Sequence, residues 1–163
     1  PQATKPYPNP LAHDKNTVAV MVRIAKKIDY AVSGALGQEE LGMLLLAAAG
    51  STYTAAELEM VIAHSTAYVT ARDGERLVGF GRLLSDGAVI AYLNNLAVEP
   101  SYQHLGIGKA MLAVLIKTAG NVRSIFLYTN TADALYQREG FCRSEKRLYV
   151  RKSETPSAGN ESP

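Results

Sequence analysis

The stretch VEPSYQHLGIGKA, residues 98–110, joins an apolar extended segment to a helical pattern through a proline turn and two glycines. Residues 91–98 predict a strand, which Pro100 ends because proline has no amide hydrogen to donate to a strand ladder. Ile107 and Met111 then begin the repeat of a buried helix face. The first amides of a helix have no intrahelical partner and carry a partial positive charge. The stretch therefore predicts an anion site suited to a phosphate or pyrophosphate.

Two well-known phosphate-binding loops do not fit these residues. A Walker A loop has a glycine where Gln103 stands and a serine or threonine where Ala110 stands. A dinucleotide-binding fingerprint has a third glycine where Met111 stands, and it belongs to the first strand-helix-strand unit of a chain. The predicted anion site is therefore of another kind.

Gln103, Gly106 and Gly108 resemble the acyl-CoA loop of the GNAT superfamily, the general-control-related N-acetyltransferases. The pattern of that loop is Gln or Arg, two residues, Gly, one residue, and Gly or Ala. Residues 134–141, ALYQREGF, resemble the second signature of the family, a short helix that carries a tyrosine and ends at Gly-Phe. Two signatures at the expected separation are more specific than either one alone.

The resemblance also includes residues 77–82, which are similar to the central hairpin of the family, and it spans about residues 67–150. It implies the GNAT fold, a mixed α/β arrangement in which about four helices flank a mostly antiparallel sheet of six to seven strands. Sequence periodicity agrees with this order. Helices are predicted over 38–49, 54–64, 106–119 and 132–139, and strands over 67–71, 76–85, 89–98, 124–129 and 141–151, with 17–24 and 27–33 as one long strand or two short ones.

Length and composition predict a single domain. At 163 residues and 47% hydrophobic, the chain can build a full core, since a domain of about 150 residues buries about 70% of its unfolded surface. Clustered prolines predict a flexible segment over 1–14, a GNAT domain over 15–152 and a flexible tail over 153–163. The formal charge of +2 argues against nucleic-acid partners.

No apolar run in the sequence approaches the roughly 20 residues of a membrane helix, and we expect no membrane partner. The single cysteine, Cys142, cannot form an internal disulfide, which predicts a reducing compartment and hence the cytoplasm. The three histidines and this cysteine show no metal-ligand spacing, so the sequence predicts no metal. A homodimer is compatible with these properties.

The resemblance implies where acetyl-CoA binds. The pantetheine arm of the coenzyme would pair with the strand before the loop, as an added strand does, with an amide at Leu96 or Val98 near the thioester carbonyl. The implied coenzyme contacts are Leu96, Ala97, Val98, Gln103, His104, Leu105, Gly106, Ile107, Gly108, Lys109, Asn130 and Tyr136. The asparagine that often precedes the tyrosine by seven residues in the family is here Thr129. Either the hydroxyl substitutes for it, or the loop shifts by one residue and uses Asn130.

Tyr136 is the residue to which the resemblance gives a catalytic role. It would donate a proton to the departing coenzyme thiolate, since a phenol of pKa about 10 is a plausible acid for a thiol of about 8.5. Because these two pKa values are close, loss of the phenol need not abolish activity. The alternative is that Tyr136 is an ordinary aromatic on the inner face of a short helix.

The acceptor amine must lose a proton before it attacks. An alkylammonium has a pKa of about 10.4, so freeing the amine at neutral pH costs roughly 4.6 kcal/mol. Some GNAT enzymes use a glutamate on the strand before the loop. The corresponding place here is Asn94 or Asn95, and neither amide can act as a base. These residues hold a water, bind the acceptor, or are polar residues of a strand bulge, and a water-relayed route is our leading hypothesis.

Two functional classes follow from the resemblance. The first is an N-acetyltransferase that moves acetyl from acetyl-CoA to a primary amine by direct attack in a ternary complex, where the amine belongs to a small molecule or a peptide. The second is a GNAT-fold module that binds acyl-CoA without turnover, as a sensor or interaction module. The missing carboxylate favours the second class, and Tyr136 favours the first.

Overall fold

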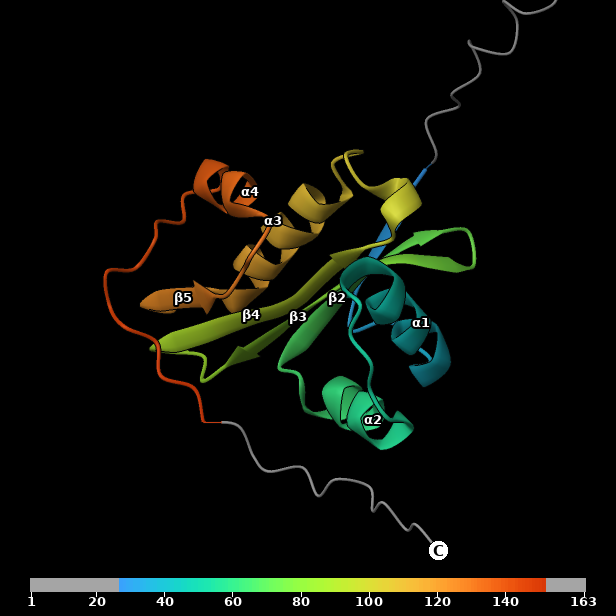
Figure 1. The fold of residues 1–163 in the computed structure, drawn as a ribbon, viewed down its shortest axis with the longest axis horizontal. Coiled ribbons are helices and arrows are strands. Elements are labelled where there is room, and N and C mark those ends of the chain that lie inside the picture. Colours follow the sequence, from blue (N-terminus) through green and yellow to red (C-terminus); the bar gives the residue numbers. More distant parts are fainter. Residues whose placement is uncertain (1–26, 152–163) are drawn as a thin grey trace, which may run out of the picture. The chain divides into compact units, whose positions relative to one another are not determined.

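The computed structural model describes residues 27–151 (Figure 1). In this range the elements are β1 (Asp29–Val32), α1 (Gln38–Ala49), α2 (Ala55–His64), β2 (Ala67–Asp73), β3 (Arg76–Ser85), β4 (Ile90–Val98), a short 3-10 helix (Pro100–Tyr102), α3 (Ile107–Ala119), β5 (Ser124–Leu127) and α4 (Asp133–Arg138). The chain divides between Tyr128 and Thr129 into two compact units, and each is described by itself. The prediction of one domain over 15–152 stays a prediction.

The first unit contains a five-stranded sheet in the order β1-β2-β3-β4-β5 (Figure 1). Neighbouring strands from β1 to β4 are antiparallel. Short turns at Asp73-Gly74 and Asp86-Gly87 connect β2 to β3 and β3 to β4, whereas α1 and α2 lie between β1 and β2 in the chain. The pair β4 and β5 is parallel, because α3 forms the crossover between them. The predicted mixed α/β sheet is confirmed.

The helices of the first unit cover both faces of this sheet (Figure 1). Phe80 of β3 is fully buried in a cluster with side chains of α1 and α2. The next residue, Gly81, faces the opposite side, where a Cβ atom would lie 3.0 Å from Leu115 of α3. Side chains alternate between the two faces of a strand, so α1 and α2 pack on one face and α3 packs on the other.

The core between the sheet and the first two helices follows the predicted helical repeat. Leu41, Leu44 and Leu45 of α1 are all buried, at the spacing of one helix face. The cluster they belong to consists of Leu41, Leu44, Leu45, Leu58, Val61, Tyr68, Leu77, Phe80 and Ala97. Helix α2 begins at a capping box, in which the Glu57 amide donates to Thr54 Oγ1 at 3.2 Å. Local sequence therefore determines where this helix starts.

One of the predicted strands is not found. The range 141–151 forms no strand, and Leu148, Tyr149 and Val150 in it are exposed. A strand needs a partner for its backbone and cover for its apolar face, and sequence propensity supplies neither. The predicted strand 17–24 lies outside the described residues, as do the predicted flexible segments 1–14 and 153–163, and 27–33 contains only the short strand β1. The described sheet therefore has five strands where six to seven were predicted.

A bidentate ion pair joins α1 to β2. Arg72 donates from Nη2 to Glu40 Oε1 at 2.6 Å and from Nη1 to Glu40 Oε2 at 2.9 Å. Arg72 also donates to the carbonyl of Ala35 at 3.1 Å, and Glu40 accepts from the Gly37 amide at 2.8 Å. The hydrogen bond from Arg72 is the main cause of a lowered pKa for Glu40. This carboxylate therefore contributes stability in its charged form.

We expect Glu40→Gln to lower the free energy of unfolding by about 1–2 kcal/mol at pH 7, because it removes a charge-assisted pair. The pKa of Glu40 is lower in the folded than in the unfolded chain, so its contribution is present above the unfolded value of 4.5 and is lost as pH falls below it. Urea unfolding at pH 7 and at pH 3 measures both effects. Exposed Glu39→Gln is the control, and an equal loss there at pH 7 would contradict the assignment.

Candidate active site

Strand β4 contains a bulge. Two of its residues, Asn95 and Leu96, lie opposite the single residue Gly81 of β3. Asn95 has a φ of +52°, a left-handed conformation that asparagine tolerates better than most residues, and its amide donates to the Asn94 side-chain oxygen at 2.8 Å. A Cβ on Gly81 would lie 2.8 Å from Leu96 Cδ1, so the Leu96 side chain packs closely against this glycine opposite the bulge. Bulges bend a strand and redirect its side chains.

The bulge coincides with the end of pairing between β4 and β5. The ladder between these two strands runs from Ile90–Ser124 to Leu93–Leu127. Strand β4 continues to Val98, and in the described ladders this last segment pairs only with β3. An extended ligand can pair with such a strand edge. The residues assigned to the pantetheine arm from the sequence, Leu96, Ala97 and Val98, lie on this segment.

The predicted anion loop lies between the short 3-10 helix and α3. Gly106 is the N-cap of α3 with a φ of +82°, and the first intrahelical hydrogen bond runs from the Ala110 amide to the Gly106 carbonyl at 3.0 Å. His104 also has a positive φ, +62°, which the sequence did not predict. Gln103 donates from Nε2 to the Val98 carbonyl at 3.1 Å and so joins the loop to β4.

The predicted loop residues lie in two places, the exposed loop and the first turn of α3. Gln103, His104, Leu105 and Gly106 are exposed. Ile107, Gly108 and Lys109 form the first turn of α3, and Ile107 is buried and anchors that turn in the core. The amides of a first helical turn precede the helical hydrogen-bond ladder, and here they face the loop. A Cβ on Gly106 would meet no atom within 4 Å, so the space beside the loop is open.

Polar contacts attach the segment before the loop to the β2–β3 hairpin. The buried Tyr102 donates from its hydroxyl to Asp73 Oδ2 at 2.6 Å. Arg76 pairs with Glu99 at 2.5 Å, and its guanidinium carbon lies 5.8 Å from the centre of the Tyr102 ring. These contacts hold the loop at one end of the sheet.

A chain of hydrogen bonds crosses the bulge. Arg82 donates from Nε to Asn95 Oδ1 at 2.9 Å, and Asn95 donates from Nδ2 to the Tyr53 hydroxyl oxygen at 3.1 Å. Sequence reasoning found Asn94 and Asn95 but missed Tyr53 and Arg82. Arg82 could have been found from the sequence, because the register of the β3–β4 hairpin pairs Arg82 with Asn94. Nothing local pointed to Tyr53, which is 42 residues before Asn95.

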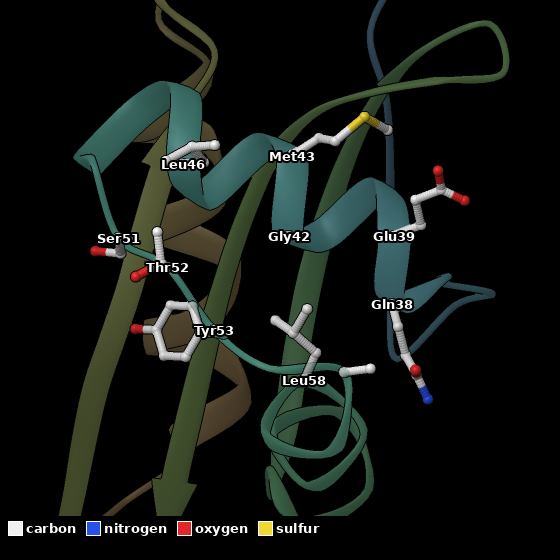
Figure 2. Close-up of a pocket in the computed structure, with 10 residues that line it drawn as sticks. Gln38, Glu39, Gly42, Met43, Leu46, Ser51, Thr52, Tyr53 and Leu58 are labelled. Carbon is white, nitrogen blue, oxygen red and sulfur yellow. The ribbon is translucent and has the colours of Figure 1, made fainter. Parts of the chain in front are cut away.

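Tyr53 also lines a pocket of about 400 Å³ between α1, the segment linking α1 to α2, and α2 (Figure 2). The pocket is lined by Gln38, Glu39, Gly42, Met43, Leu46, Ser51, Thr52, Tyr53, Ala55 and Leu58. Met43, Leu46 and Leu58 make much of this lining apolar, and Glu39 adds a carboxylate. The ring of Tyr53 lines the pocket while its hydroxyl reaches the β4 bulge, so this residue connects the two.

Two further tyrosines flank the bulge. The rings of Tyr92, on β4, and Tyr128, just after β5, lie 5.4 Å apart. Burial is the main cause of a raised pKa for Tyr92, and the nearby Tyr128 and Tyr53 also raise it while Arg82 lowers it. Phenols from two other segments and Arg82 therefore act on Tyr92, which stays protonated at neutral pH.

The second unit contains Tyr136 on the short helix α4. The Phe141 amide donates to the Tyr136 carbonyl at 3.0 Å, and the two rings meet edge to face with centres 5.8 Å apart. The two aromatic residues of the second signature are thus in contact. Burial raises the pKa of Tyr136, which keeps its phenol protonated at neutral pH.

The segment before α4 bears on the question of Thr129 or Asn130. Thr129 Oγ1 accepts hydrogen bonds from the amides of Ala132 at 3.1 Å and Thr131 at 3.3 Å, as a threonine does in a local turn. Asn130 is exposed. Of the predicted site residues, Asn130 and Tyr136 belong to the second unit, and all the others belong to the first.

Residues 27–151 contain neither a candidate metal centre nor a candidate membrane span. No group of three or more His, Cys, Asp or Glu side chains in that range could hold a metal ion. Within the same residues, no helix has the length and apolar character needed to cross a membrane.

Comparisons with known proteins agree on a family. A model of the acetyltransferase (GNAT) domain matches residues 63–143. The chloroplastic GCN5-related N-acetyltransferase 2 of Arabidopsis thaliana is 32% identical over 109 residues, which are 60% of this chain and 42% of that relative. The chain belongs to the GNAT superfamily of acetyltransferases. It spans less than half the length of this curated relative.

Solved structures share the fold. A protein of unknown function from methicillin-resistant Staphylococcus aureus, described as a probable acetyltransferase, has a TM-score of 0.71 at 25% identity, over 77% of this chain and 100% of that chain. Arabidopsis thaliana NAA60, solved in complex with a bisubstrate analogue, has a TM-score of 0.60 at 20% identity, over 71% of this chain and 84% of that chain. The predicted GNAT fold is confirmed.

Proposed function

We propose that this protein is an N-acetyltransferase that moves acetyl from acetyl-CoA to a primary amine by direct attack in a ternary complex. The observation that carries the proposal is the combination of an open strand edge, from the bulge to Val98, with the amide-rich start of α3. Membership of the GNAT superfamily and the bisubstrate complex of NAA60 support it.

The residues of the loop and the strand edge fit a coenzyme A. The first-turn amides of α3, preceded by Gly106, would hold the pyrophosphate, since amide hydrogens and the helix dipole favour an anion. The backbone from Leu96 to Val98 would pair with the pantetheine arm, and an amide there would polarise the thioester carbonyl. When bound, acetyl-CoA supplies the activated acetyl group.

We assign the acceptor to the pocket between α1 and α2. Tyr53 lines this pocket, and its hydroxyl accepts a hydrogen bond from Asn95 at the bulge, so an amine held beside Tyr53 would be near the strand edge where the thioester would lie. The Asn95 side chain is bonded at both its carbonyl and its amino end, to Arg82 and Tyr53. We therefore give Asn95 an orienting role and propose that a water beside Asn94 carries the amine proton to solvent.

Tyr136 is proposed as the acid that protonates the departing thiolate. We expect Tyr136→Phe to lower kcat by about 10- to 100-fold while leaving the KM for acetyl-CoA within about 3-fold, because the phenol would act on the leaving group and would be only one of many coenzyme contacts. Steady-state thiol release measures both constants. Tyr149→Phe, which changes an exposed tyrosine of the same unit, is the control. An unchanged kcat in Tyr136→Phe would remove the residue from the chemistry.

Thiol release from acetyl-CoA tests the proposed function. The full chain is assayed against a panel of small amines, amino acid amides and peptides, and acetyl-CoA binding is measured in parallel by calorimetry. We expect turnover on at least one class of primary amine. Tight binding of acetyl-CoA with no turnover on any acceptor would overturn the enzyme assignment and favour a non-catalytic acyl-CoA sensor or interaction module.

A further inference from the structure

We propose that Arg82 and Asn95 are positioning residues that direct the hydroxyl hydrogen of Tyr53 toward an oxygen atom of the acceptor. This inference rests on the proposed function, and it names a substrate class: a primary amine with a carbonyl or hydroxyl oxygen close to the nitrogen and an apolar substituent beside it. It concerns only residues of the first unit, whose contacts are described above.

The orientation of the Asn95 amide follows from the chemistry of its neighbour. A guanidinium has donors and no acceptor, so the Asn95 atom at 2.9 Å from Arg82 Nε must be the carbonyl oxygen. The amino group of Asn95 then faces Tyr53, 3.1 Å from the hydroxyl oxygen. The positive φ of Asn95 and the bond from its amide to Asn94 hold this side chain at the bulge.

The hydrogen bond from Asn95 determines what the Tyr53 hydroxyl can do. A phenol oxygen that accepts a hydrogen bond from Asn95 cannot also donate its hydrogen to that group. Its O–H hydrogen is therefore available to another acceptor atom beside the β4 bulge, which the hydroxyl reaches. The Tyr53 oxygen already accepts one hydrogen bond, and a second accepted bond would be weaker. This hydroxyl therefore mainly offers its hydrogen to a ligand atom that accepts. An alkylammonium group, which only donates, does not match it.

The pocket lining determines the rest of the substrate class. Met43, Leu46 and Leu58 line the pocket that the Tyr53 ring also lines (Figure 2). An apolar substituent of the acceptor would be removed from water there, whereas a second cationic group would lose hydration. Glu39, the carboxylate of this lining, is exposed to solvent, so salt screens its attraction for a cation. A polyamine is therefore a poorer fit than an amino acid amide with an aliphatic side chain.

Two amines test this inference directly. Leucinamide carries a carboxamide next to its amine, and 3-methylbutylamine has the same aliphatic group without the carboxamide. We expect the wild-type chain to prefer leucinamide in kcat/KM, and Tyr53→Phe to lower kcat/KM for leucinamide by about 10-fold with little change for 3-methylbutylamine. A purely structural role of Tyr53 would not change the preference between the two amines, because misfolding lowers kcat/KM equally for both.

The substitution Asn95→Asp tests whether Asn95 acts by orienting the Tyr53 hydroxyl. The carboxylate introduced by this substitution would still accept from Arg82 but would also accept from Tyr53, so the hydroxyl hydrogen would turn away from the acceptor. We expect the same loss of preference as in Tyr53→Phe, and no further loss in the double variant, because both changes remove one donor. Tyr128→Phe, which removes the hydroxyl of the ring that packs on Tyr92, should keep the preference.

The possible failures are distinct. If the wild-type chain turns over amines but Tyr53→Phe keeps the wild-type preference, this inference is overturned and the proposed function stands. Additive losses in the double variant would overturn the positioning role of Asn95. If the wild-type chain binds acetyl-CoA and acetylates no amine, both the proposed function and this inference fall.

Discussion

We expect Gly106→Glu to weaken acetyl-CoA binding by at least about 100-fold. The substitution places a carboxylate at the N-cap of α3, where the proposed pyrophosphate would lie. Two like charges about 4 Å apart repel by about 4 kcal/mol at the effective dielectric constant of a protein surface, and about 1.4 kcal/mol is a factor of ten in affinity. Isothermal titration with acetyl-CoA measures the loss.

Gly87→Glu is a closely matched control. Gly87 and Gly106 have φ values of +75° and +82°, and a Cβ on either would meet no atom within 4 Å. Both variants therefore carry the same new charge and a similar backbone strain of about 1–3 kcal/mol. Gly87 lies in the turn between β3 and β4, where no ligand is proposed, so the affinity of this variant for acetyl-CoA should stay that of the wild type. Equal affinity in the two variants would place the coenzyme elsewhere.

The second large effect concerns the attachment of α1 and α2 to the sheet. Phe80 is fully buried among side chains of both helices, and its ring lies 5.8 Å from that of Tyr68. We expect Phe80→Ala to lower the free energy of unfolding by about 3–5 kcal/mol, the usual cost of a cavity of that size. Because the proposed acceptor pocket lies between α1 and α2, affinity for the acceptor should fall as well.

Urea unfolding measures the loss of stability, and Phe126→Ala provides the comparison. Phe126 on β5 is 48% exposed, so removing the same atoms there deletes fewer contacts and should cost clearly less. If both variants lose the same free energy, Phe80 is not the centre of the packing between the sheet and these helices.

Local signals explain why so much of the fold could be predicted from the sequence. The bounds predicted for α1 are those observed, because Gln38 to Ala49 combines an apolar repeat with a glycine on each side. The capping box at Thr54 starts α2, and Gly106 starts α3 as the anion-loop pattern requires. Each of these signals acts over a few residues, so it is the same in the sequence as in the folded chain.

Other predictions depended on contacts that a sequence pattern does not contain. The range 141–151 has residues suited to a strand, but a strand exists only when another edge pairs with it. A strand bulge was one of the alternatives that the family resemblance left open for Asn94 and Asn95, but the left-handed backbone of Asn95 and its bond to Asn94 required the coordinates.

The sequence by itself determined the class of this protein, because Gln103, Gly106, Gly108 and the Tyr136 helix are local patterns whose spacing is read along the chain. Only the tertiary structure brought together Arg82, Asn95 and Tyr53. These residues come from two strands and an interhelical link, and their contact depends on how α1 and α2 pack on the sheet. Hydrogen-bond partners distant in sequence leave no periodic signal, so the polar chain beside the proposed acceptor pocket was visible only in the folded protein.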